Sequence, residues 1–272
     1  RNWGADAPRR FFGDKHWNQP VRWNRLAEAA GRRARVFCSS MADVFERHRR
    51  DDINEQMDAA RAKLWLLIDS TPWLDWQLLT KRPENIAEML PPAWLDAPRP
   101  NVWLGTTAEN QETLNLRAHV LCAVPAVVHF LSVEPLLGPL DVSEALWPVC
   151  EGWPAGYGTP EDALAAGKMV TYSMQSLLLQ STADRHVSWI ICGGESGPKS
   201  RRMDPAWALS LKVQCERSGT PFFLKQAGTV LGREWGCKQP HGADPSEWPE
   251  EFNVQQFPKG APLPSMQGAL FP

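Results

Sequence analysis

The hydrophobic residues of this 272-residue chain gather in six short runs, separated by longer stretches of mixed character. Within each run the apolar residues are largely continuous and do not alternate with polar ones. Strands buried on both faces of a parallel sheet have this pattern. The sequence therefore predicts six buried strands, at 35–38, 76–79, 102–104, 127–131, 189–192 and 221–224.

Helical patterns lie between most of these runs. They predict helices at 54–69, at 83–90, from Asn110 to Leu121, and from Asp204 to Gly219. Asn110 and Asp204 are favourable N-cap residues, and Gly219 suits the end of a helix. The alternation of strand and helix predicts an α/β fold with a parallel sheet, which forms a partial or full TIM-like βα-repeat barrel.

Two regions interrupt this alternation of predicted strands and helices. Residues 141–186 are rich in glycine and proline and precede the fifth predicted strand, so we interpret them as an insertion. Insertions of this kind often act as lids or contact a partner. Residues 229–272 are rich in Pro, Gly and Trp. We therefore expect a barrel-like domain over 1–228 and a C-terminal extension over 229–272 that wraps the surface.

The distribution of charge along the chain is more informative about a binding partner than the formal net charge of −2. Residues 1–50 contain 12 Lys and Arg but only 5 Asp and Glu. A basic segment beside an acidic body is typical of a protein with a phosphate-rich partner, such as a nucleic acid or a nucleotide. A solvated basic face and a protein partner are the alternatives.

The six cysteines form no CxxC pair and have no zinc-type spacing, so the sequence predicts no metal site. We expect Cys38 and Cys192 to be small buried residues. Neither a signal peptide nor a membrane span is visible, which favours a cytoplasmic protein with reduced thiols. No catalytic triad and no HExxH motif is present, and His129 is predicted to be a core residue.

Each apolar run is followed at once by a small polar cluster. The clusters are 39–43, 80–83, 105–109, 132–135, 193–197 with Arg201 and Arg202, and 225–226. In parallel α/β proteins, binding and catalytic groups collect at the carboxyl ends of the strands. We therefore expect these six clusters to form one reactive surface.

Several roles follow from that position. We expect Gly193 and Gly194 to let a ligand approach the backbone, and Glu195 to accept hydrogen bonds from an amino or hydroxyl group. Positive charge for a carboxylate or phosphate comes from Lys81, Arg82, Arg202 and Lys225. The predicted substrate-binding set is Asp43, Lys81, Arg82, Arg202 and Gln226.

Each cluster also has a structural interpretation. Ser39 and Asp43 are possible helix caps, and Glu134 before Pro135 can bind a neighbouring backbone. The two glycines can simply make a tight turn, and Lys81 and Arg82 can face solvent.

The order of these segments resembles a known family. "RVFCSSMADVF", "LLTKRPENI", "PNVWLGTTAENQE", "VHFLSVEPLLGPL", "WIICGGESGPKSRRMDPAW" and "QCERSGTPFFLKQAG" are similar to segments of a phage-associated family of unassigned function. Members of that family carry an N-terminal three-cysteine motif. The resemblance covers residues 17–228 and includes "WNQPVRWNR".

That family is similar to radical S-adenosylmethionine enzymes, in which three cysteines hold an iron–sulfur cluster that cleaves S-adenosylmethionine. The resemblance implies these two cofactors and a radical-SAM-like barrel. From their positions at the strand ends, we expect the following residues to line the cofactor and substrate cavity: Ser39, Thr106, Ser132, Glu134, Gly193, Gly194, Glu195 and Ser196. The three-cysteine motif itself is absent from this chain, and by the family's order it precedes Arg1. The start at Arg1 without a Met favours that placement.

Three functions stay open at this point. The first is a radical S-adenosylmethionine-like enzyme that modifies or repairs a nucleic acid or nucleotide. The second is a cluster-independent barrel enzyme that uses Glu134, Glu195 and Lys225 for acid–base catalysis. The third is a non-catalytic module that binds nucleic acid or protein.

Overall fold

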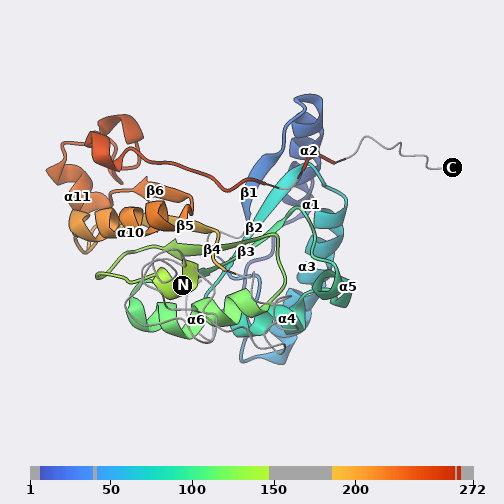
Figure 1. The fold of residues 1–272 in the computed structure, drawn as a ribbon. Coiled ribbons are helices and arrows are strands. Elements are labelled where there is room, and N and C mark those ends of the chain that lie inside the picture. Colours follow the sequence, from blue (N-terminus) through green and yellow to red (C-terminus); the bar gives the residue numbers. More distant parts are fainter. Residues whose placement is uncertain (1–6, 39–41, 147–185, 261, 265–272) are drawn as a thin grey trace, which may run out of the picture.

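Six parallel strands form an open, curled half-barrel in the computed structural model, which describes residues 7–38, 42–146, 186–260 and 262–264 (Figure 1). The strands lie side by side in chain order. They are β1 (Ala34–Cys38), β2 (Leu74–Thr80), β3 (Val102–Thr107), β4 (Val128–Val133), β5 (Trp189–Gly193) and β6 (Phe222–Gln226). The α/β class, the six strands and the partial form of the barrel are therefore confirmed.

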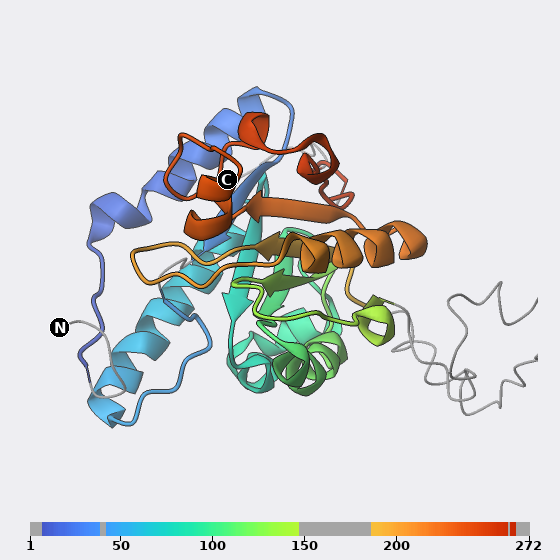
Figure 2. The same ribbon diagram turned by 90° about the vertical axis from the view of Figure 1, so that its left-hand side faces the viewer.

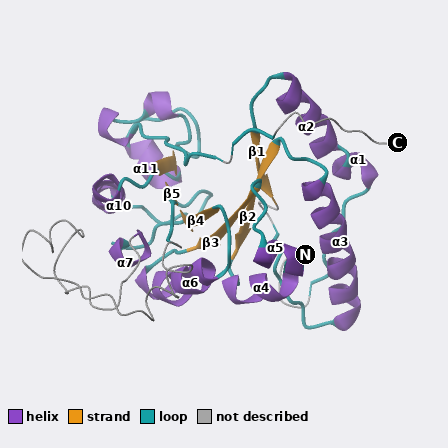
Figure 3. Cartoon of the chain, turned by 45° about the vertical axis from the view of Figure 1, so that its right-hand side comes forward, coloured by secondary structure: helices purple, strands orange, loops and turns teal. Residues whose placement is uncertain are grey.

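Helices lie around the outside of this sheet (Figures 2 and 3). In the described residues they are α1 (Asp14–Trp17), α2 (Gln19–Ala29), α3 (Asp51–Asp69), η1 (Pro83–Asn85), α4 (Ile86–Met89), α5 (Pro92–Asp96), α6 (Gln111–Ala123), α7 (Ser143–Leu146), α10 (Pro205–Ser218), α11 (Thr229–Glu234), η2 (Pro245–Glu247) and η3 (Glu250–Phe252). Helix α2 packs on β1 and β2, α6 on β3 and β4, and α10 on β5 and β6. Most of the predicted insertion, 147–185, lies outside the described residues.

The predicted helix ends are confirmed by their hydrogen bonds. The Asn110 side chain accepts from the backbone N–H of Thr113 at 2.9 Å, and the Thr113 hydroxyl accepts from the backbone N–H of Asn110 at 3.2 Å. Asp204 accepts from the backbone N–H of Ala206 at 2.9 Å. Gly219 ends α10 with a φ of 69°, a left-handed conformation that glycine adopts without a steric penalty.

The two faces of the sheet have separate cores. The larger core fills the space between the sheet and the helices and includes Cys38 and Cys192, as predicted. His129 is also buried, and its Nε2 lies 2.7 Å from the carbonyl oxygen of Val124. A smaller cluster covers the concave face and consists of Trp103, Val128, Phe130, Trp189 and Ile191. Successive side chains of a strand point to opposite faces, which is why neighbours in the sequence belong to different cores.

A glycine on β3 makes room for the Phe130 ring of the concave cluster. A Cβ on Gly105 would lie 2.3 Å from the ring of Phe130, which sits on the neighbouring strand β4. The Phe130 ring therefore occupies the space that a side chain on β3 would otherwise fill.

Strand β1 differs from the predicted continuous burial, because Arg35 and Phe37 are exposed. Both side chains point to the concave side, and β1 is an edge strand of an open sheet. No opposite wall of a closed barrel covers them.

The C-terminal segment crosses the amino-terminal end of the concave face. Gln255 pairs with Phe223 as an antiparallel bridge on the outer edge of β6. The ring of Phe257 then lies 5.4 Å from that of Trp189 and 5.0 Å from that of Phe223. The Arg35 guanidinium stacks 3.5 Å from the same Phe257 ring. This segment therefore connects the β6 side of the half-barrel to β1 (Figure 1).

Candidate functional site

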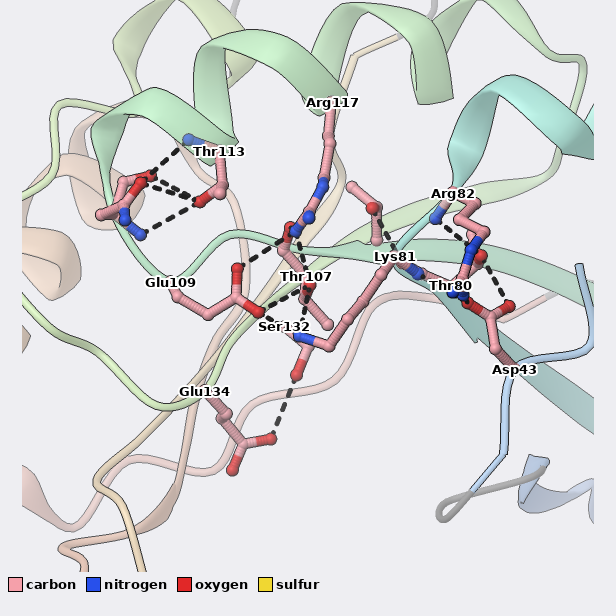
Figure 4. A network of polar contacts seen from close by, with 12 residues as sticks. Asp43, Thr80, Lys81, Arg82, Thr107, Glu109, Thr113, Arg117, Ser132 and Glu134 are labelled. Carbon is pink, nitrogen blue, oxygen red and sulfur yellow. Dashed lines mark hydrogen bonds and ion pairs between the residues drawn. The ribbon is translucent and has the colours of Figure 1, made fainter. Parts of the chain in front are cut away.

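Charged and hydroxyl side chains replace the aromatic ones toward the carboxyl ends of the strands. Ser132 follows Phe130 by two positions on β4, and Lys225 follows Phe223 by two on β6. A spacing of two keeps these side chains on the concave face. We call the group formed by Lys81, Thr107, Glu109, Arg117, Ser132, Glu134 and Lys225 the strand-end mouth. Figure 4 labels all of these residues except Lys225.

Glu134 is the centre of one half of the mouth. Its Oε2 accepts a hydrogen bond from the Ser132 hydroxyl at 3.1 Å and another from the Lys225 ammonium at 3.1 Å. The Glu134 side chain is 14% exposed, whereas Lys225 is 51% exposed, so the lysine is the solvent-facing partner. The Lys225 ammonium also lies 5.9 Å from the ring of Phe37 on β1. Side chains from β4, β6 and β1 therefore meet here.

Gly193 is what allows Glu134 to sit at this place. A Cβ on Gly193 would come 2.5 Å from the Glu134 carboxylate. The neighbouring Gly194 has a different role, because its Cβ would meet the Ala227 backbone oxygen at 2.1 Å. Gly193 thus makes room for a side chain of the mouth, whereas Gly194 allows two backbone segments to pack together.

Glu109 is the centre of the other half of the mouth. It pairs with Lys81, and its Oε2 lies 3.1 Å from Arg117 of α6. Thr107 joins this group, since its hydroxyl accepts from Arg117 at 2.9 Å and from Lys81 at 3.3 Å (Figure 4). Burial alone would raise the pKa of Glu109. Hydrogen bonds from Lys81 and from its own backbone N–H, with the charges of Lys81 and Arg117, instead hold that pKa below its ordinary value.

Asp43 and Arg82 form a separate group beside the mouth. Asp43 accepts from the Thr80 hydroxyl at 2.7 Å and from the Arg82 guanidinium at 2.9 Å. It also accepts from the backbone N–H of Phe45 and caps no helix. The Asp43 carboxylate therefore fastens the loop after β1 to the end of β2, and both of its oxygens are engaged in that role.

Other predicted site residues lie apart from the mouth. Glu195 forms an ion pair with Arg201 at 2.7 Å, and that hydrogen bond lowers the pKa of Glu195. Arg202 pairs with Glu234 on the surface at 2.8 Å. These two charged pairs lie in exposed surroundings.

The remaining predicted residues have local partners or no described position. The Gln226 amide donates to the Gly194 carbonyl at 2.8 Å. Thr106 is fully buried on the opposite face of β3 and donates to the Thr80 carbonyl at 2.9 Å. Ser196 is exposed, and Ser39 lies outside the described residues.

Three mouth residues were given no role from the sequence. Thr107 and Glu109 belong to the polar cluster after the third apolar run, and their spacing of two from Gly105 was a usable signal. Arg117 lies well inside α6, and only the folded structure brings it to Thr107 at 2.9 Å.

The described residues do not provide a metal site. Among them, no group of three or more His, Cys, Asp or Glu side chains could hold a metal ion. Burial raises the pKa of the Cys192 thiol well above its ordinary value, and it raises that of Cys215 to about 12. Buried thiols of this kind stay protonated and are poor ligands. Within the described part of the chain, no helix is both long enough and apolar enough to span a bilayer.

The fold and the mouth define an α/β half-barrel protein with a charged site at the carboxyl ends of its strands. A family model described as "Protein of unknown function (DUF5131)" matches residues 2–256, so the chain belongs to that family. No curated protein and no solved structure matches the chain. The prediction of a family of unassigned function is thereby confirmed.

Proposed function

We propose that the strand-end mouth binds S-adenosylmethionine and that the protein is a radical S-adenosylmethionine-like enzyme acting on a nucleic acid or nucleotide. One observation carries the proposal: two ion pairs of a carboxylate with a lysine meet at the mouth, Lys225–Glu134 and Lys81–Glu109, so that the two carboxylates lie between the two lysines in the order of the strands. The phage association and the cytoplasmic location belong to this proposal as well. Among the described residues, Cys122, Cys192, Cys215 and Cys237 form no disulfide, which is consistent with the location.

The presence of both charges at the mouth suits a ligand that carries both signs. The amino acid part of S-adenosylmethionine has an ammonium group, which Glu134 and Glu109 can accept, and a carboxylate, which Lys225 and Lys81 can bind. Its sulfonium is a permanent cation. The exposed ring of Phe37, which already has the Lys225 ammonium nearby, offers such a cation an aromatic face.

The described residues support one of the two expected cofactors, S-adenosylmethionine, better than the other, an iron–sulfur cluster. The charges of the mouth support binding of S-adenosylmethionine, whereas the described residues offer no ligand set for an iron–sulfur cluster. We therefore derive no step through a cluster. When bound, S-adenosylmethionine supplies an activated carbon–sulfur bond. The residues of this chain bind it and fix its orientation at the ends of β2, β3, β4 and β6.

Titration calorimetry with S-adenosylmethionine tests this proposal. We expect the unaltered chain to bind it. Glu134→Gln and Lys225→Met should each weaken binding roughly ten-fold, because each removes one charge-assisted hydrogen bond to the ligand. The matched controls are Glu234→Gln and Lys238→Met, which change exposed residues away from the mouth. Failure of the unaltered chain to bind, or equal affinity in Glu134→Gln and Glu234→Gln, overturns the proposal.

A second candidate is the cluster-independent enzyme. The 3.1 Å contact between Lys225 and Glu134 favours it, because a carboxylate and an amine in contact can exchange a proton during acid–base catalysis. In that case Glu134→Gln abolishes turnover that needs no S-adenosylmethionine. Turnover that depends on added S-adenosylmethionine excludes this candidate.

A further inference from the structure

The segment from Arg10 to Arg32, which contains α1 and α2, carries a set of basic side chains that form no ion pair among the described residues. They are exposed, and they comprise Arg10, Lys15, Arg22, Arg25 and Arg32. Arg10 precedes α1, and Arg32 follows α2. Only Asp14 and Glu28 oppose these basic side chains on the same helices, and Asp14 is bound to Lys63 at 3.0 Å. Helices α1 and α2 therefore present an uncompensated positive surface.

Exposed aromatic rings are concentrated in the same place. Phe11, Phe12 and Trp23 are 42%, 51% and 41% exposed. Among the described residues, the other phenylalanines and tryptophans with this degree of exposure are Phe37 of β1 and Phe257, which Arg35 of β1 covers. Solvent-facing aromatic rings thus belong to the segment just before α1, to α2 and to the edge of the half-barrel. The Phe12 ring also stacks on His16, with 4.4 Å between the ring centroids.

The geometry of α2 explains which side chains it exposes. Pro20 and Ala27 are buried against the sheet, and Asn24 accepts from the backbone N–H of Trp73 at 2.8 Å. Trp23 and Leu26, three positions apart, lie next to each other on the remaining surface of the helix. Arg22 lies three positions before Arg25 and four before Leu26, so basic and apolar side chains adjoin on this surface.

This surface leads toward the strand-end mouth. After α2 the chain turns at Gly31 and enters β1, where Arg35 and Phe37 are exposed on the concave side. Phe37 lies 5.9 Å from the Lys225 ammonium, and Lys225 binds Glu134. We call the surface formed by Arg10, Phe12, Arg22, Trp23, Arg25, Arg32, Arg35 and Phe37 the basic–aromatic edge.

We propose that the basic–aromatic edge binds single-stranded nucleic acid and directs it to the mouth. This inference rests on the proposed function and names its substrate class. Unpaired arginines attract phosphates, and exposed rings stack on unpaired bases, which is how sequence-tolerant binding of single strands is achieved. A duplex keeps its bases stacked on one another and cannot use the rings.

Fluorescence anisotropy with a labelled single-stranded oligonucleotide tests the inference. We expect binding at low salt, and the double variant Arg22→Gln/Arg25→Gln to weaken it roughly ten-fold or more. The slope of log affinity against log salt concentration should fall by about 0.7 for each phosphate that the variant no longer neutralises. Trp23→Ala should weaken binding about five-fold or more with an unchanged salt slope, because stacking releases no counterion.

Matched controls are Arg217→Gln/Arg233→Gln and Leu116→Ala, which alter exposed residues on α10, α11 and α6. These variants should bind like the unaltered chain. The inference is overturned by the absence of oligonucleotide binding, by equal affinity in the arginine variant and its control, or by a duplex bound as tightly as the single strand. Equal competition by polyglutamate also overturns it and indicates an acidic protein partner.

Calorimetry on the same variants separates this inference from the proposed function. Arg22→Gln/Arg25→Gln should bind S-adenosylmethionine with unchanged affinity while it loses the oligonucleotide. If every edge variant binds the oligonucleotide normally but the unaltered chain binds S-adenosylmethionine, only the edge assignment fails. If the oligonucleotide binds as expected but S-adenosylmethionine does not, only the proposed function fails.

Discussion

The two ends of the concave face differ in composition although the same strands build both. At the amino-terminal end, Trp103, Phe130, Trp189 and Phe223 pack together, and the C-terminal segment covers them. At the carboxyl end, Glu134 and Glu109 are paired with lysines, and one partner in each pair faces solvent. One face is thus divided between an aromatic end that is packed and a charged end that reaches solvent. Substitutions at the two ends should therefore separate stability from binding.

The strongest test of this division is Trp189→Ala. Trp189 is 2% exposed, lies among Trp103, Phe130, Phe223 and Phe257, and donates from its Nε1 to the Gln256 carbonyl at 2.9 Å. We expect the free energy of unfolding to fall by about 3–5 kcal/mol, since the substitution leaves a large cavity. Urea denaturation measures this loss.

The control for Trp189→Ala is Leu116→Ala, which changes a side chain that is 62% exposed and should shift stability by no more than about 0.5 kcal/mol. Equal effects of the two substitutions would show that the aromatic end does not support the fold.

The neighbouring glycines provide a second test, at the charged end. Gly194→Ala should cost about 1–3 kcal/mol of stability, because its Cβ would meet the Ala227 backbone at 2.1 Å. Gly193→Ala should cost less, since the Glu134 side chain can swing away. It should nevertheless weaken ligand binding roughly ten-fold. Denaturation and calorimetry on both variants check this contrast, and the reverse order of stabilities contradicts it.

A smaller loss of stability is expected from Phe257→Ala. The substitution removes the ring that contacts Trp189 and Phe223 and that the Arg35 guanidinium covers. Aromatic contacts of this kind predict a loss of about 1–2 kcal/mol. Hydrogen exchange should also accelerate at the Leu224 amide, which donates to the Val254 carbonyl at 2.8 Å.

Phe11→Ala, at a ring of similar exposure that is not part of this stack, is the control for Phe257→Ala. Unchanged exchange at Leu224 would mean that the segment does not depend on Phe257.

The smallest effect is a pH dependence at the mouth. The pKa of Glu109 is lower in the folded chain than its ordinary value of 4.5. The stability from ionised Glu109 is therefore fully present above pH 4.5 and is lost as the pH falls through the lowered pKa. The stability difference between the unaltered chain and Glu109→Gln should shrink on acidification from about pH 6 to about pH 3. A difference that grows on acidification has the opposite sign to this prediction.

The elements were predictable because their signals are local. The Asn110 and Asp204 caps and the left-handed Gly219 each depend on a few neighbouring residues. Glu134, Ser132 and Lys225 were predicted for the site because they come just after the apolar runs of β4 and β6. Whether they also bind a ligand stays a prediction.

The pairing of side chains could not be predicted in the same way. Glu195 and Arg202 occupy equivalent strand-end positions, yet each pairs with a nearby opposite charge on the surface. Arg117 reaches the mouth only because α6 packs on β3 and β4. Such partners depend on the distance between elements and on rotamers, which periodicity does not specify.

The contact between Arg35 and Phe257 also constrains the order in which the molecule can be completed during synthesis. Chains leave the ribosome from the amino terminus, so β1 emerges long before the segment that lies against it. Until residues 255–257 appear, the rings of Trp189 and Phe223 lack their cover. Between the synthesis of Phe223 and that of Phe257, a nascent chain of this protein therefore presents an uncovered aromatic patch. Premature termination shortly before Phe257 should yield products that depend on chaperones and are readily degraded.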